Sequence, residues 1–123
     1  MIAVIGYWLS AAIALGIVLI GARFLITPYA AAAGFGVPVV PDPRWDAYLS
    51  VKAIRDIAAG LFTAILILNR STQLLGFFML AATIIPLADA AIVIRHRGPK
   101  AAAIGIHGAT AGLLIISGFL LFG

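Results

Sequence analysis

The sequence predicts an all-α integral membrane protein, a bundle of four transmembrane helices with a short interfacial helix after the first. Hydrophobic residues make up 64% of the 123 residues, whereas about 45–50% is usual in soluble domains. Charged residues make up 10%, and the mean hydropathy is +1.21. A soluble domain this small could not hide so much apolar surface, whereas four membrane crossings of about 20 residues each could use it. We therefore expect a single transmembrane domain, residues 1–123.

Several kinds of chemistry are excluded by composition. The chain has no Cys, which excludes disulfides, thiolate nucleophiles and cysteine-ligated metals. It has no Glu, so its only acidic side chains are Asp42, Asp46, Asp56 and Asp89. The eight Lys and Arg residues lie near the borders of apolar segments, where they indicate topology and contacts with membrane lipids rather than nucleic acid. No residue pattern indicates a metal site or a cofactor.

The first expected span covers about residues 2–26, and no Lys or Arg precedes it, which argues against a cleaved secretory signal. Thr27 and Pro28 then favour a helix start, with Thr27 as the cap, and Gly34 or Gly36 can end that helix. This pattern predicts the short interfacial helix. Three prolines in the following segment predict an extended connector, residues 37–44.

Three further spans are expected, at about residues 47–68, 74–94 and 101–122. Pro86 should kink the third span, because proline removes a backbone donor. Small residues at four-residue spacing predict close packing of the first and fourth spans, and they also allow a homo-oligomer. The clearest of these positions are Gly6, Ser10 and Ala14 in the first span, and Gly105, Ala109, Gly108 and Gly112 in the fourth.

Positive charges predict the orientation of the four spans. The face with the first and third connections carries five cations near its borders, whereas the opposite face carries only Arg70 besides the terminal amine. By the positive-inside rule the first of these faces is cytoplasmic. We therefore expect a multi-pass protein of the cell inner membrane with both termini on the non-cytoplasmic side.

A charged segment at the start of the second span must enter the membrane, because the apolar run after it, residues 57–68, is too short to cross alone. Lys52, Arg55 and Asp56 share one stripe of a helix. Each intramembrane charge costs about 2.5–3.5 kcal/mol. We therefore expect these residues to join Asp89 in one ion-pair network inside the bundle.

Two other spans bring ionisable groups to a similar depth. Asp89 lies five residues before the end of the third span and His107 six after the start of the fourth, roughly 8–10 Å below the cytoplasmic face at 1.5 Å per residue. We interpret Asp56, Asp89 and His107 as candidate catalytic residues lining a cavity. The candidate ligand-binding residues are Lys52, Arg55, Tyr48 and Trp45. A purely structural interpretation stays open, in which Lys52 and Arg55 extend to the interface and Asp56 neutralises Lys52.

The chain resembles small bacterial four-span proteins grouped as a domain of unknown function and similar in layout to the DoxX-like membrane proteins. The resemblance is carried by the short helix at residues 27–36, the segment 52–60, Asp89 and the segment 105–108. It implies a four-helix bundle in which Lys52, Arg55, Asp56 and His107 match the motif. Some DoxX-like proteins accompany quinone-linked oxidoreductases, but the resemblance supplies no chemistry for this chain.

Three functions remain open at this point. The first is a buried charged pocket that binds a lipophilic small molecule such as a quinone or isoprenoid, with acid–base processing of that molecule as an extension. The second is a non-catalytic membrane subunit or assembly factor. The third is a proton-coupled small exporter, which we rank last because such exporters carry an essential Glu in the first span and this span has no acid.

Overall fold

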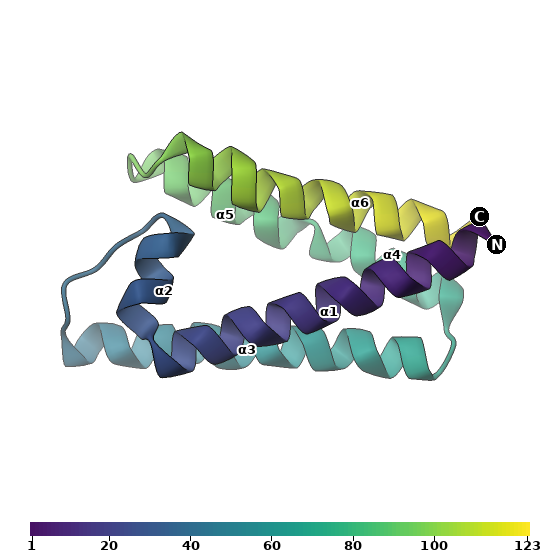
Figure 1. Ribbon diagram of the computed structural model, residues 1–123, viewed down its shortest axis with the longest axis horizontal. Helices are drawn as coiled ribbons and strands as arrows, with labels where there is room; N and C mark the ends of the chain where they lie inside the picture. The colour runs from purple at the N-terminus through teal and green to yellow at the C-terminus, as the bar shows by residue number, and fades with distance from the viewer.

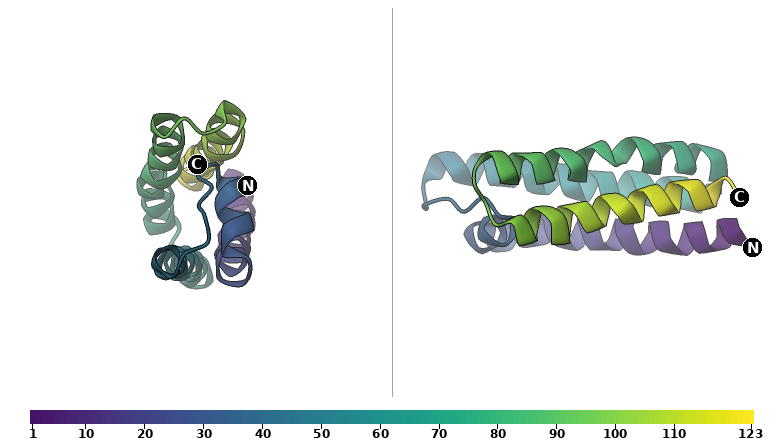
Figure 2. Two further views of the ribbon diagram at one scale, coloured as in Figure 1. Left: turned by 90° about the vertical axis from the view of Figure 1, so that its left-hand side faces the viewer. Right: turned by 90° about the horizontal axis from the view of Figure 1, so that it is seen from above.

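A computed structural model describes residues 1–123, and all of its regular secondary structure is helical. Long helical passes lie side by side along the long axis, a shorter helix crosses one end, and both termini lie at the other end (Figure 1, Figure 2). The elements are α1 (Ile2–Ile26), α2 (Pro28–Phe35), α3 (Pro43–Leu68), α4 (Thr72–Ala82), α5 (Ile84–Arg95), the π-helix η1 (Ala101–Gly108) and α6 (Ala109–Leu121). The expected all-α class is confirmed.

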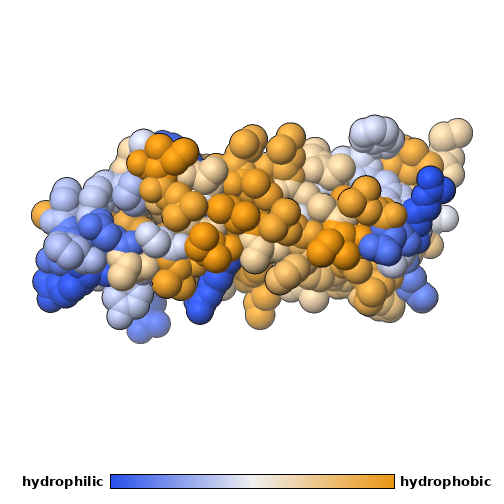
Figure 3. Space-filling view, turned by 90° about the horizontal axis from the view of Figure 1, so that it is seen from below, coloured by the Kyte–Doolittle hydropathy of each residue, from blue (hydrophilic) through white to orange (hydrophobic).

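Three segments are long and apolar enough to cross a membrane: Ile2–Ile26, Thr72–Arg95 and Ala101–Leu121. They indicate a multi-pass membrane protein, and hydrophobic surface covers the middle of the molecule between hydrophilic ends (Figure 3). The sequence analysis expects four such helices, and one of the four does not meet this criterion. The helix that fails is α3, whose last 18 residues include three charged side chains, Lys52, Arg55 and Asp56.

The boundaries of α1 and α2 agree with the sequence analysis, but the role expected for Thr27 is wrong. The Thr27 hydroxyl does not cap α2; it donates to the carbonyl of Arg23, 3.2 Å away. Pro28 provides the helix start instead, because its fixed φ suits the first helical position. Gly36 ends α2 with φ of +108°, a conformation that costs glycine little.

Helix α3 begins at Pro43, four residues earlier than expected. The carboxylate of Asp42 accepts a hydrogen bond from the Arg44 backbone N–H at 2.8 Å, which caps the helix, and Pro43 occupies its first turn. Hydrogen bonds from the Arg44 side chain and backbone lower the pKa of Asp42. The Tyr29 hydroxyl donates to the Asp46 carboxylate, which raises the pKa of Tyr29 and ties α2 to the start of α3.

The third expected span is interrupted, as Pro86 predicts. Helix α4 ends at Ala82 and α5 begins at Ile84, because Pro86 has no N–H to donate to the carbonyl of Ala82. The Thr83 hydroxyl donates to the carbonyl of Met79 at 3.1 Å, which adds a side-chain hydrogen bond at the break.

Small residues set the helix crossings, partly where the sequence analysis placed them. Gly6, Ser10 and Ala14 are buried as expected, and the Ser10 and Ser117 hydroxyls share a 2.6 Å hydrogen bond between α1 and α6. The expected packing at Gly105 and Gly112 is wrong within the chain, because a Cβ at either position would meet no atom within 4 Å. The small residues of the first span therefore pack against other helices of the same chain, whereas Gly105 and Gly112 of the fourth span have no neighbouring helix beside them.

Candidate functional site

The ammonium of Lys52 is the centre of a mixed polar and aromatic cluster near the α2 end of the bundle. Its Nζ lies 2.8 Å from the Oδ2 of Asp56, one turn later on α3. It also lies 4.6 Å from the ring centre of Phe24 and 4.9 Å from that of Phe35. A carboxylate and two aromatic faces therefore stabilise one cation. The Asp56 side chain is largely buried, with 13% of its surface exposed.

His107 joins this cluster through its contacts with Phe35. Its Nε2 donates to the backbone carbonyl of Phe35 at 2.9 Å, and the two rings lie 4.3 Å apart. A carbonyl can only accept, so Nε2 carries the proton, and in the neutral imidazole Nδ1 is the free acceptor. Phe35 therefore connects the ion pair on α3 with the buried imidazole of η1.

The position of Phe35 depends on the left-handed turn that follows it. A Cβ at Gly36 would lie 2.9 Å from the Val93 side chain on α5 and 3.2 Å from that of Ala102 on η1. A Cβ at Gly98 would lie 2.4 Å from the carbonyl oxygen of Gly36. Two glycines thus let the end of α2 pack directly on the turn between α5 and η1.

Asp89 on α5 has no protein partner. It makes no ion pair within 4.0 Å and no hydrogen bond, although Lys52, His107 and Asp56 are the charged or ionisable groups whose fields reach its carboxyl. No fully buried polar side-chain atom in the structure lacks a partner. The Asp89 oxygens, the second oxygen of Asp56 and the Nδ1 of His107 therefore contact accessible space. Helices α3 and α5 do not pack closely against each other.

The structure leaves three expected residues out of the cluster. Arg55 is exposed and unpaired, so the expected single ion-pair network is wrong, and only Lys52 and Asp56 form an ion pair there. The inward face of α3 is centred on Ala53 and Gly60, and Arg55, about 200° around the helix from Ala53, projects away from it. Trp45 and Tyr48 are 45% and 70% exposed on the first turns of α3, as membrane-interface anchors would be.

Phe24 and Phe35 are the site residues that the sequence analysis missed. Phe35 stands as the one large apolar side chain between two glycines, a signal that could have been used. The π-helical backbone of η1 was also missed. Runs of π-helix are rare and frequently occur at functional sites, and His107 lies in this one.

The two principal pockets of the molecule lie elsewhere. One, of about 350 Å³, is near the termini, and the other is an apolar groove of about 340 Å³ between α1 and α3. Neither is lined by Asp56, Asp89 or His107. No group of three His or Asp side chains gathers closely enough to hold a metal ion.

Comparison with known proteins gives a family and no function. No curated protein and no solved structure matches the chain. The family model described as "Domain of unknown function (DUF4267)" matches residues 14–121, a range that contains all the residues of the cluster. Because this match covers most of the chain, the protein belongs to the DUF4267 family.

Proposed function

We propose that this protein binds a lipid-soluble small molecule whose polar group lies among Asp56, Asp89 and His107, between α3, α5 and η1. The observation that carries this proposal is the unpartnered carboxylate of Asp89, on a segment apolar enough to span the membrane. An intramembrane carboxylate is costly, and pairing with a ligand offsets that cost. The accessible atoms of Asp56 and His107 add two further acceptors on other helices.

The arrangement suits a ligand that donates hydrogen bonds, such as a quinol or an isoprenoid alcohol. Asp89 and the Nδ1 of His107 would accept from its hydroxyl groups, while the rings of Phe24 and Phe35 contact its apolar part. The same acceptors can take up a proton, so acid–base processing of the bound molecule is an extension of the proposal. Lys52 is already paired with Asp56 and serves to keep the net charge of the site low.

The proposal includes α3 as a fourth transmembrane span. The Tyr7 hydroxyl near the start of α1 and the Thr72 hydroxyl at the start of α4 share a 2.5 Å hydrogen bond, so both spans begin at the same end. The chain must therefore return across the membrane between them, and only α3 is long enough, with 26 residues or about 39 Å at 1.5 Å per residue. A four-span bundle of this kind supports the DoxX-like layout.

We expect both termini on the non-cytoplasmic side of the inner membrane, from the positive-inside rule. Alkaline phosphatase fused after Gly123 should be active, and green fluorescent protein at the same position should be dark. The matched control is the same pair of reporters fused after Arg97, in the α5–η1 turn, where the pattern should invert. Fluorescence at the C-terminal position would contradict the orientation, and equal signals from both reporters would indicate dual topology.

Ligand binding is tested by mass spectrometry of extracts from the purified protein, with and without added quinols and isoprenoid alcohols. We expect Asp89→Asn to lower retention of the bound molecule about tenfold, because a hydrogen bond to a charged acceptor contributes about 1.5–3 kcal/mol. Asp46→Asn is the control, since Asp46 is exposed at the start of α3. Equal retention by wild type and Asp89→Asn would contradict the proposal.

A second candidate function, a non-catalytic membrane subunit or a homo-oligomer, is favoured by the open face at Gly105 and Gly112. Small residues at this spacing let another helix approach closely. A purified protein that holds no small molecule but elutes as a complex of defined size would favour this candidate over the first.

A further inference from the structure

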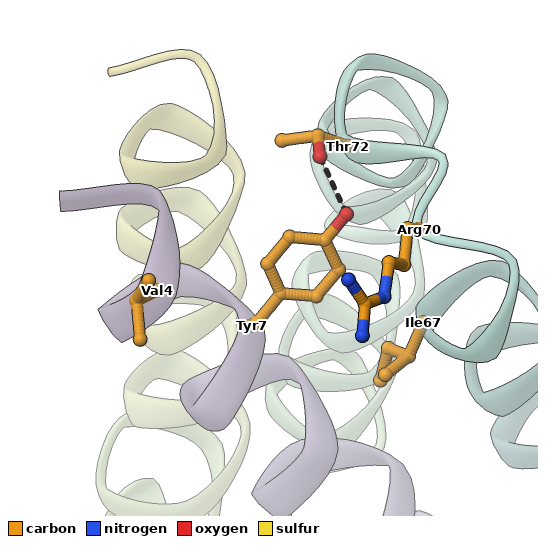
Figure 4. A pocket seen from close by; sticks show the side chains of 5 residues that line it. All are labelled: Val4, Tyr7, Ile67, Arg70 and Thr72. Carbon is orange, nitrogen blue, oxygen red and sulfur yellow. Dashed lines mark hydrogen bonds between the residues drawn. The ribbon is translucent and has the colours of Figure 1, made fainter. Parts of the chain in front are cut away.

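A pocket of about 350 Å³ opens at the end of the bundle where the termini lie and is separate from the Lys52 cluster. Its five lining residues are Val4, Tyr7, Ile67, Arg70 and Thr72, from α1, the end of α3, the α3–α4 turn and the start of α4 (Figure 4). The Tyr7 and Thr72 hydroxyls form a hydrogen bond with each other beside the Arg70 guanidinium (Figure 4). The pocket therefore has a cationic and hydroxyl-bearing side and an apolar side.

Arg70 is the one side-chain cation at this end, and it has no acid to pair with. No carboxylate lies within 4.0 Å of it, and the four Asp residues are at the start of α3 or in the Lys52 cluster region. Arg70 lies two residues before the span Thr72–Arg95, so it lies at the membrane border, the level of lipid phosphates. It has φ of 53°, a conformation uncommon for a residue with a side chain.

An apolar groove adjoins the pocket and indicates an apolar part of the ligand. The apolar groove of about 340 Å³ between α1 and α3 shares Ile67 with this pocket and continues from it toward the middle of the bundle. Eight of its nine lining residues are hydrophobic, including Ala14, Val18 and Ala64. From Tyr7 in the pocket to Val18 at the far end of the groove, the two together follow α1 for about 16 Å at 1.5 Å per residue, close to half of a hydrocarbon core of about 30 Å.

We infer that this pocket and groove together form a binding site for an anionic phospholipid. The phosphate accepts hydrogen bonds from Arg70 and from the Tyr7 or Thr72 hydroxyl, and one acyl chain lies in the groove between α1 and α3. The depth of the groove fits a chain that occupies a single leaflet. An arginine guanidinium suits a lipid phosphate, because it offers several N–H donors and a positive charge to the phosphate oxygens.

The test is native mass spectrometry of the delipidated full-length protein, titrated with palmitoyl-oleoyl phosphatidylglycerol. Arg70→Gln should weaken binding about tenfold, because a hydrogen bond to a charged group contributes about 1.5–3 kcal/mol. Arg97→Gln is the matched control: it removes the same charge from a turn residue with a similar φ, 59°, at the other end. Ala64→Leu, which fills the groove without changing charge, should also weaken binding.

The comparison ligands are phosphatidylcholine with the same chains, oleate and inorganic phosphate. We expect phosphatidylglycerol to bind most tightly and inorganic phosphate, which has no chain for the groove, to bind weakest. Equal weakening by Arg70→Gln and Arg97→Gln would overturn the proposal, because it would show unspecific attraction to border cations. Phosphate binding as tight as lipid binding, with no effect of Ala64→Leu, would show a free-anion site and also overturn it. Neither result bears on Asp89 and the ligand proposed there.

Discussion

Gly60→Ala should destabilise the protein by about 1–3 kcal/mol, the usual cost of forcing extra volume into a close-packed contact. A Cβ at Gly60 would lie 2.4 Å from the Cγ2 of Val18 and 2.8 Å from the backbone carbonyl of Ala14. The carbonyl cannot move away without displacing α1, so the two helices would have to separate. Because Lys52 lies on α3 and Phe24 on α1, separating the two helices would also disturb the contact of the Lys52 ammonium with the Phe24 ring.

The measurement is the free energy of unfolding in mixed micelles titrated with denaturing detergent. Gly16→Ala is the matched control, since a Cβ there would meet nothing within 4 Å. In the interior of a helix, alanine is more favourable than glycine by about 0.5–1 kcal/mol, so this control should be neutral or stabilising. If the two variants unfold at the same detergent fraction, α1 and α3 do not cross where the structure places them.

His107→Ala should release the end of α2 from the bundle and cost about 2–4 kcal/mol, from the cavity left behind and the unpaired carbonyl. The imidazole is 6% exposed and holds the last residue of α2 in two ways, by the hydrogen bond to the Phe35 carbonyl and by ring contact. Without it, Phe35 loses one of the groups that keep its ring over Lys52. Hydrogen–deuterium exchange across residues 28–42 measures the release.

His107→Gln separates the structural role of this residue from proton transfer. A glutamine amide can donate to the Phe35 carbonyl but cannot take up a proton at the operating pH. We expect slow exchange across residues 28–42 to be largely retained in His107→Gln and lost in His107→Ala. If exchange across residues 28–42 stays slow in both variants, α2 is held by the contacts of Gly36 and Tyr29 without His107. That result would contradict the role given to the imidazole.

The sequence by itself determined the class of protein and most helix boundaries. Apolar content and the length of the apolar runs require a membrane environment whatever the packing, because the cost of exposing those side chains to water does not depend on their partners. Local signals at Pro28, Gly36 and Pro86 act on their own neighbours in the chain, and the structure shows the elements they predict. Asp42 and Pro43 are also local signals for the start of α3. The sequence analysis instead interprets the prolines of this segment as an extended connector.

Only the tertiary structure decided which polar residues meet. Helical spacing places Lys52, Arg55 and Asp56 on one stripe, yet the contact of α1 with Ala53 and Gly60 sets the inward direction of α3 and turns Arg55 out. The position of Phe35 depends on Val93 and Ala102, more than fifty residues away along the chain, and on the room that two glycines leave there. Such contacts come from steric fit between distant segments, for which a single sequence carries no local signal, and they decide that the Phe35 ring contacts both Lys52 and His107.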